Sequence, residues 1–265
     1  MLVLTLAGCG RVFPRHSDAG ATASDAPATA KITAAVVSPT PQPTPSPTRP
    51  VLQTAAPLVT RPADAELPGR AEMLSAFREI AFTSEYPGTP DERGEIRKWT
   101  EPVRLAVHGS PTREDEAALA LAMDGLNALP GFPGISAVET DANAEIWFVK
   151  LDQMDDVIPG YVEGNWGFFT VSYDTGRITY AAIAIATDVT DQSARTHLIH
   201  EELLQSTGLM QDSYAYPESI FYGEWTTAPE PLPMDWELLK ILYMEELEPG
   251  MSEKDAMAKL NDIYP

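Results

Sequence analysis

Residues 201–212 read E-E-L-L-Q-S-T-G-L-M-Q-D and carry the features of a helix end. Glu201 and Gln205 are four positions apart, so we expect them to share one face of a helix. Gly208 is expected to end that helix, because glycine readily adopts the left-handed conformation found after a helix C-cap. Glu201 and the adjacent Glu202 are costly to bury unless they are paired or protonated. The pattern therefore predicts a helix whose polar face needs partners.

The spacing of these residues resembles the zinc helix of metzincin proteases, H-E-x-x-H-x-x-G-x-x-H-D, with every metal-binding histidine replaced. Glu201, Gln205 and Gln211 stand at the three histidine positions. Glu202 keeps the position of the general base, and Asp212 keeps that of the residue after the third ligand. The resemblance implies an α+β fold of the zincin type, with a small mixed sheet, a central helix carrying a degenerate metal motif, and C-terminal helices.

The following segment also resembles matrixin-type metzincins. Residues 213–222 correspond to the loop that carries the Met-turn, and Phe221 stands in place of its methionine. Residues 235–243 resemble the closing helix, which begins near an Asp and ends in L-Y. The string E-E-x-x-Q-x-x-G-L-x-x-D-S, a later S-I-F and a terminal L-Y…P-G-M also resemble an uncharacterised family of proteobacterial lipoproteins. That second resemblance implies a domain of unknown function and no chemistry.

The replacements determine which chemistry we expect. A glutamine carbonyl suits calcium or magnesium better than zinc, so an all-oxygen set from Glu201, Gln205 and Gln211 would be a poor zinc site. We expect no metal cofactor, with a divalent metal as the alternative. Without a metal, the simplest arrangement has the amide groups of Gln205 and Gln211 donating hydrogen bonds to Glu201. We therefore expect a pseudoenzyme, a non-catalytic binding or structural module.

Two alternatives remain open at this point. The first is a peptidase-like hydrolase in which Glu202 acts as general base with an unusual metal or none, and Arg195, Tyr216 and Tyr222 are candidates for stabilising an oxyanion by position only. The second is a different metal site.

That second site would use His197, His200 and Glu201, since two histidines and one carboxylate can bind zinc. Adjacent helix positions differ by about 100°, however, so the plainer prediction has one histidine packed and the other near the surface.

The N-terminal residues indicate where in the cell the protein is located. Residues 2–9 read L-V-L-T-L-A-G-C, which resembles a bacterial lipobox with Cys9 as the lipidated residue. Cys9 is the single cysteine of the 265 residues. Residues 1–9 are thus predicted to be a lipoprotein signal segment, and the protein is expected in the cell envelope, lipid-anchored to the outer membrane and facing the periplasm. The lipid anchor makes the membrane one partner, and a peptide or an envelope protein is the other partner that we consider.

Two further regions follow from composition. Residues 10–63 are rich in Pro, Thr, Ala and Ser and should form a disordered tether, because they cannot bury enough apolar area to offset ordering entropy. Residues 64–265 have the length of one domain. The net charge of −21 argues against nucleic acid as a partner, since phosphates would be repelled.

Periodicity predicts the elements of the domain. Helices are expected over residues 64–82, 112–129, 190 to about 207, 235–246 and 252–260. Strands are expected over residues 96–107, 144–151, 166–173 and 177–187, the last two as a hairpin. Several aromatics lie on these strands, and the strand over residues 177–187 precedes the central helix. We expect that strand to be the sheet edge at which an extended peptide could add, although core packing of the aromatics is the more common outcome.

Overall fold

The computed structural model describes residues 2–6, 67–82, 94–224 and 230–265. Cys9 and the predicted tether over residues 10–63 lie outside the described residues. The lipidation site and the tether therefore stay predictions.

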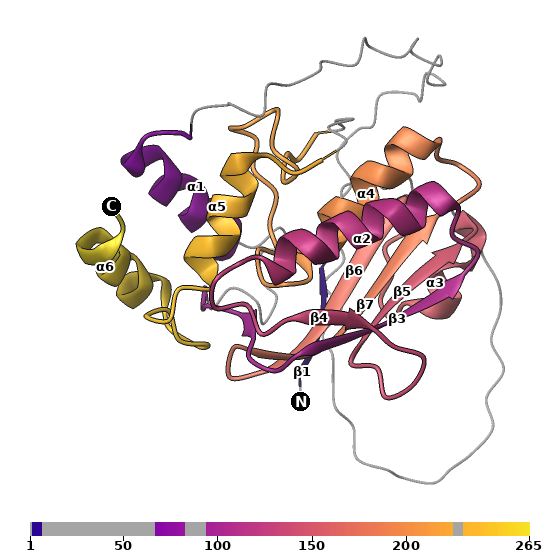
Figure 1. The fold of residues 1–265 in the computed structure, drawn as a ribbon, viewed down its shortest axis with the longest axis horizontal. Coiled ribbons are helices and arrows are strands. Elements are labelled where there is room, and N and C mark those ends of the chain that lie inside the picture. The colour runs from indigo at the N-terminus through magenta and orange to yellow at the C-terminus, as the bar shows by residue number, and fades with distance from the viewer. Residues whose placement is uncertain (1, 7–66, 83–93, 225–229) are drawn as a thin grey trace, which may run out of the picture. The chain divides into compact units, whose positions relative to one another are not determined.

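One mixed seven-stranded sheet forms the centre of the domain (Figure 1). Its strands are β1 (Leu2–Leu6), β2 (Lys98–Trp99), β3 (Val103–Gly109), β4 (Ile135–Ala137), β5 (Ala144–Val149), β6 (Gly167–Asp174) and β7 (Arg177–Ala186). The order across the sheet is β1-β6-β7-β5-β3-β4, and β2 pairs with β7 off this path. The β4, β3, β5 and β7 strands run parallel, whereas β6 is antiparallel to β7 and β1 is antiparallel to β6.

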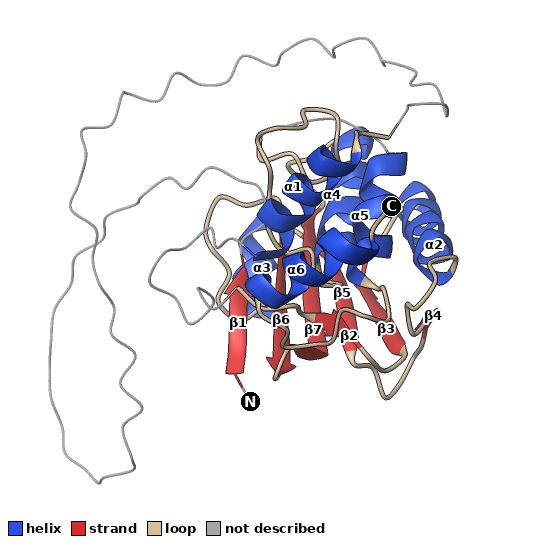
Figure 2. Ribbon diagram, turned by 90° about the vertical axis from the view of Figure 1, so that its left-hand side faces the viewer, coloured by secondary structure: helices blue, strands red, loops and turns tan. Residues whose placement is uncertain are grey.

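Two helices, α2 (Arg113–Asn127) and α4 (Gln192–Gln205), lie over one face of this sheet. Three more, α1 (Arg70–Phe82), α5 (Pro233–Leu242) and α6 (Glu253–Ile263), lie together beside one end of it (Figure 1 and Figure 2). The large hydrophobic core lies between these helices and the sheet. A smaller cluster on the other face packs beneath the short helix α3 (Met154–Val157), around Phe168 and the alanines of β7. Among the described residues, no helix has the length and apolar character needed to cross a membrane.

Local sequence signals explain most of these elements. The α+β class with a mixed sheet, a central helix and C-terminal helices is confirmed. Thr112 and Asp115 form the predicted capping box of α2. The hairpin of β6 and β7 turns through Thr175 and Gly176, both at positive φ. The strand expected over residues 96–107 is instead divided into β2 and β3, and the break contains Pro102, which has no N–H to donate to a sheet.

The predicted sheet edge was wrong. The strand that precedes the central helix, β7, lies inside the sheet between β6 and β5, and β6 pairs with β1 on its far side. The hairpin causes this difference, because β6 folds back along the outer side of β7. Chain order alone does not reveal on which side of a hairpin the sheet continues.

Gly208 fixes the way in which the chain leaves α4. Its φ is +130°, a region that side chains rarely adopt, and a Cβ at this position would lie 2.0 Å from the carbonyl oxygen of Arg97. The backbone of the segment that leads into β2 therefore passes directly against the end of α4. A residue with a side chain would force these two segments apart.

Replacing Gly208 with alanine should lower the free energy of unfolding by at least about 2 kcal/mol, because the change adds backbone strain to a backbone clash. Urea denaturation measures the effect. The matched control is Gly69→Ala, since nothing lies within 4 Å of a Cβ at Gly69. Equal stability of the two variants would contradict the role given to Gly208.

Candidate functional site

The first turn of α4 is fixed to α2 by a buried carboxylate. Asp115 is 0% exposed and accepts hydrogen bonds from Gln192 Nε2 at 2.7 Å and from Arg195 Nε at 3.1 Å. It also accepts one from the backbone N–H of Thr112 at 2.8 Å. Asp191 caps the same helix by accepting a hydrogen bond from the N–H of Ala194 at 2.9 Å. One carboxylate thus holds the starts of two helices together.

These contacts control the ionisation of Asp115. Burial alone would raise its pKa, but the hydrogen bonds from Thr112, Gln192 and Arg195 outweigh burial and hold the pKa below its ordinary value. The charged form is therefore the one that the fold stabilises.

The last turn of α4 is held by two buried aromatic side chains. The indole Nε1 of Trp99 donates to the carbonyl of Ser206 at 3.2 Å, and the hydroxyl of Tyr243 donates to the carbonyl of Thr207 at 2.8 Å. Carbonyls at a helix end have no partner inside the helix, so these donors satisfy them. Burial raises the pKa of Tyr243, which keeps its hydroxyl protonated and able to donate.

Between these two ends lie the adjacent carboxylates of the motif, both fully buried. Glu201 and Glu202 are each 0% exposed. Glu201 Oε2 lies 3.2 Å from Nε2 of His197, one helical turn earlier. Glu202 lies against the first residue of β6, because a Cβ on Gly167 would come within 2.5 Å of Glu202 Oε1. The glycine therefore allows the helix and the strand to approach closely over this carboxylate.

The glutamines do not bind Glu201 as expected. Gln205 is 1% exposed, and its Nε2 donates to Asp212 Oδ1 at 2.7 Å. The side-chain amide of Gln211 does not donate to Glu201 either, and its backbone N–H donates to the carbonyl of Ile80 on α1 at 3.2 Å. The correction has a simple cause: His197 already lies beside Glu201 on the same helix face, and Asp212 follows α4 closely enough to reach Gln205. The network does join the helix to the loop after it, but through different pairs.

Both histidines of α4 are buried, which corrects the expectation that one lies near the surface. His197 is 2% exposed and His200 is 0% exposed. Nε2 of His200 lies 3.0 Å from the carbonyl oxygen of Ala118 on α2, away from the pair formed by His197 and Glu201. The core on the α2 side thus takes up His200, so neither histidine lies near the surface. In the part of the chain that the structure describes, no group of three His, Cys, Asp or Glu side chains could hold a metal ion.

The donor set at the family's metal positions does not fit zinc. Glu201 is paired with His197, and Gln205 directs its amide nitrogen to Asp212. A hydrogen-bonded glutamine and a paired carboxylate lack the imidazole or thiolate character that tetrahedral zinc sites use. The arrangement is a polar network that supports its own helix.

The candidate oxyanion donors face other partners. Arg195 binds Asp115 at the start of α4. The hydroxyl of Tyr216 lies 3.4 Å from the carbonyl of Glu72, and the hydroxyl of Tyr222 lies 3.4 Å from the Glu224 carboxylate. The structure thus does not bring these three side chains together at Glu202.

The loop after the motif is fixed by the fully buried Asp235 of α5. Its carboxylate accepts hydrogen bonds from Ser219 Oγ at 2.5 Å, from the N–H of Ile220 at 3.1 Å and from the N–H of Leu232 at 2.6 Å. Phe221, at the Met-turn position, is 0% exposed. The Asp at the start of the closing helix therefore anchors the loop over the core.

A second polar cluster, on the other face of the sheet, was not anticipated. Tyr180 donates to Glu145 Oε2 at 2.7 Å, and the ring of His108 stacks on Trp147 with centroids 4.0 Å apart. His108 Nε2 lies 3.7 Å from Glu145 Oε1. The signal in the sequence is the alternation of β5, which puts Glu145 and Trp147 on one face. It does not show which neighbouring strands bring His108 and Tyr180 to that face.

Comparison with known proteins identifies a family whose function is unknown. A family model described as "Protein of unknown function (DUF2927)" matches residues 70–262. No curated protein matches the chain. Among solved structures, one entitled "Structure of Myroilysin" matches with 16% sequence identity and a TM-score of 0.28, and the match covers 54% of this chain and 59% of that chain. The chain thus spans less than two thirds of the length of that protein, and a TM-score of this size assigns neither a fold nor an activity.

The pKa of Asp115 leads to a pH-dependent prediction. Asp115→Asn should lower the free energy of unfolding by about 3 kcal/mol at pH 7, because it leaves the guanidinium of Arg195 without its buried partner. A carboxyl whose folded pKa is depressed stabilises the fold above its unfolded pKa of about 4, and it loses this contribution as pH falls through the folded value. The difference from the natural chain should therefore shrink below about pH 4.

Urea denaturation at a series of pH values measures this effect. Glu114→Gln, an exposed neighbour in the same helical turn, is the matched control and should change little. A difference that stays constant from pH 7 to pH 3 would show that the charge of Asp115 is not what stabilises the fold.

Proposed function

The chain belongs to the DUF2927 family of proteins of unknown function, and we propose that it is a bacterial envelope lipoprotein whose domain is a non-catalytic binding or structural module with a degenerate metzincin-like site. One observation carries the proposal. The side chains of Glu201 and Gln205 are buried, Nε2 of His197 lies 3.2 Å from Glu201 Oε2, and Gln205 Nε2 donates a hydrogen bond to Asp212. Groups engaged in this way support a fold more readily than they support a reaction.

The position of Glu202 supports the same conclusion. A general base must reach the proton that it abstracts, within hydrogen-bond distance of a substrate or of a water. Glu202 is 0% exposed and lies against the backbone of β6 at Gly167. A substrate would have to separate α4 from β6 to reach it, which would break the close approach that the glycine allows.

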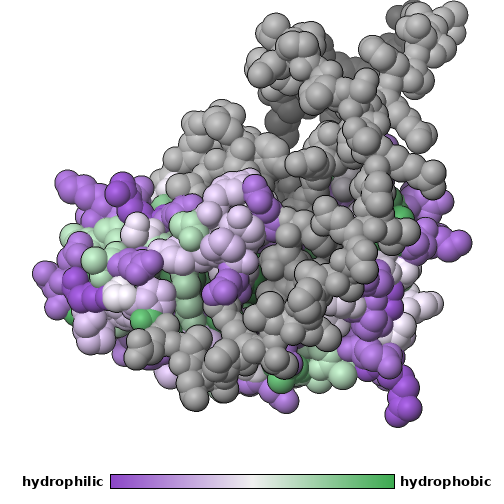
Figure 3. All heavy atoms as spheres, turned by 90° about the horizontal axis from the view of Figure 1, so that it is seen from above, coloured by the Kyte–Doolittle hydropathy of each residue, from purple (hydrophilic) through white to green (hydrophobic). Residues whose placement is uncertain are grey.

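The envelope assignment rests on the sequence. Cys9 has the position that a lipobox requires, and residues 10–63 have the composition of a tether that would hold the domain away from the membrane. On the face that Figure 3 shows, the visible described residues are a mixture of hydrophilic ones and smaller hydrophobic patches. A strongly acidic chain would not bind anionic lipid by charge, so the lipid would supply the membrane attachment and the domain would face an envelope protein or a peptide.

Thermal unfolding in the presence of added metal ions tests the non-catalytic role. Zinc, manganese or calcium, added to the chain purified without a histidine tag, should leave the thermal midpoint unchanged. A bound ion at 100 times its Kd would stabilise the folded state by about 2.7 kcal/mol, which thermal unfolding detects easily. Glu202→Gln should leave any background hydrolysis of casein unchanged. The proposal fails if an ion raises the midpoint and Glu201→Ala abolishes that rise, or if Glu202→Gln removes a hydrolytic activity.

Fractionation of cells tests the lipid anchor. The natural chain should appear in the membrane fraction with a lipid-modified Cys9 at its N-terminus, as mass spectrometry of the mature protein would show. Cys9→Ser should move the chain out of that fraction. Cleavage before Cys9 would also remove Leu2–Leu6, the segment that forms β1, so the mature form would leave the outer side of β6 unpaired. A mature protein that retains residues 2–6 would contradict the lipoprotein assignment.

A further inference from the structure

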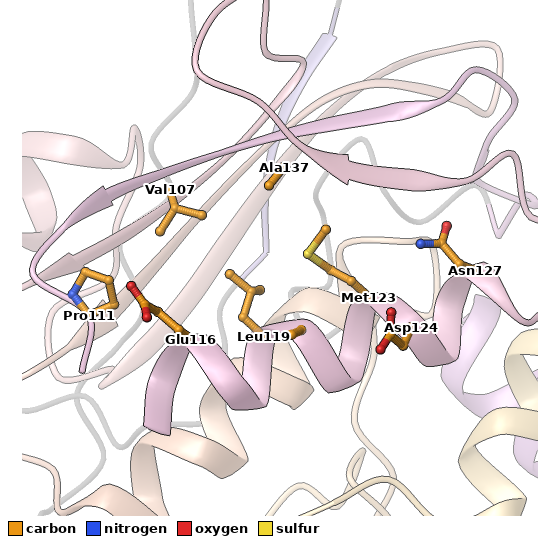
Figure 4. A pocket seen from close by; sticks show the side chains of 9 residues that line it. Val107, Pro111, Glu116, Leu119, Met123, Asp124, Asn127 and Ala137 are labelled. Carbon is orange, nitrogen blue, oxygen red and sulfur yellow. The ribbon is translucent and has the colours of Figure 1, made fainter. Parts of the chain in front are cut away.

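A groove lies between α2 and the edge of the sheet that is farthest from β1. It has a volume of about 340 Å³ and is lined by Val107, Pro111, Glu116, Leu119, Ala120, Met123, Asp124, Asn127 and Ala137. Figure 4 shows Val107 and Ala137 on the strands pointing toward Leu119 and Met123 on the helix. Most of the exposed lining is apolar. None of these side chains takes part in the network around Glu201.

The backbone beside this groove is an open sheet edge. The β3 strand pairs with β5 as far as Gly109, but on its other side it pairs with β4 only through Val103–Leu105. The chain leaves this edge after the N–H of Val138 has bonded to the carbonyl of Leu105. Among the described residues, nothing extends β4 along the rest of β3. An added strand would find free backbone groups there.

An apolar side chain on the helix side of the sheet is also left uncovered. Val107 is the register partner of Ile146, so both face the helices. Ile146 is 0% exposed, whereas Val107 is 37% exposed. The core is therefore incomplete at this edge, and an apolar side chain from an added strand would complete it.

The rim of the groove is acidic. Glu116 and Asp124 are exposed, and both line the groove from α2, eight residues apart (Figure 4). Residues 64–265 contain 37 of the 39 acidic residues of the chain and 13 of its 18 basic ones. The charge of the groove and that of the whole domain thus favour a cationic ligand.

We propose that an extended segment of a partner protein, with an apolar side chain between Lys or Arg residues, binds here as an added strand along β3. Its backbone pairs with β3 beyond Leu105, its apolar side chain fills the space between Val107 and Met123, and its basic residues face Glu116 and Asp124. The proposal rests on the binding-module function and names its site and the chemistry of its partner. The proline-rich part of the chain itself, residues 39–50, is a poor occupant, because its alternating prolines have no N–H to pair with a strand.

Fluorescence anisotropy with the full chain tests this site. The probe is a labelled heptapeptide, Thr-Lys-Thr-Val-Thr-Lys-Thr, whose two Lys side chains and central Val side chain lie on the same face of an extended strand. One control peptide has Glu in place of both Lys residues, and the other has Pro in place of the central Val. The natural chain should bind the probe in a saturable manner and should bind both control peptides at least about tenfold more weakly, because the first repels the rim and the second cannot pair.

A matched pair of variants locates the binding. Ala120 lines the groove and is exposed, so Ala120→Phe should fill the groove and weaken binding of the probe at least about tenfold. Ala117 is exposed on the same helix outside the lining, so Ala117→Phe should bind as the natural chain does. Thermal unfolding of both variants verifies that each is folded.

Three results would overturn the proposal. The first is no saturable binding of the probe to the natural chain, and the second is equal binding by Ala120→Phe and Ala117→Phe. The third concerns residues 31–37 of the chain itself, K-I-T-A-A-V-V, which combine a Lys with apolar residues as the proposed partner does. It is binding that appears only after these residues are replaced by a Gly/Ser segment of equal length. The last result would mean that the chain's own segment occupies the groove. None of these results depends on metal binding or on hydrolysis, so failure here leaves the non-catalytic role to its own test.

Discussion

Burial of two adjacent carboxylates inside one helix is the constraint on which the rest of the domain depends. Glu201 and Glu202 have no exposed surface, and a buried charge without compensation costs several kcal/mol. Nε2 of His197 lies 3.2 Å from Glu201 Oε2 on the same helix, and Gly167 leaves room for Glu202 where β6 packs against α4. A side chain at position 167 would push the strand away from the helix, so this glycine keeps α4 and β6 in close contact.

Contacts at both ends of α4 hold the helix in this position. Asp115 fixes the first turn to α2 through Arg195, and Trp99 and Tyr243 satisfy the last carbonyls from β2 and the end of α5. These anchors come from segments that are distant in sequence. They hold α4 in the core, although the sequence of this helix is only weakly amphipathic. Every residue of this helix from His197 to Gln205 is buried, whereas Ser193 in its first turn is exposed.

The sequence correctly predicted the structural features that depend on residues close together in the chain. The capping box at Thr112, the turn before β7 and the helix end at Gly208 follow from residue types at fixed spacing, and all three are present. It failed where the outcome depends on which segment arrives from elsewhere. Burial of His200 is decided by the carbonyl of Ala118 on another helix, and Gln205 binds Asp212 because the loop after α4 turns back toward it. Periodicity along one chain segment does not contain that information.

The two edges of the sheet now differ in a way that bears on function. On the β6 side, the motif helix packs against one face of the strand, and β1 pairs with its outer edge, which cleavage before Cys9 would leave unpaired. On the β3 side the strand continues beyond its partner β4, and Val107 stays exposed beside a helix whose rim is acidic. A strand added at β3 would bury apolar surface and pair backbone groups without disturbing any buried charge.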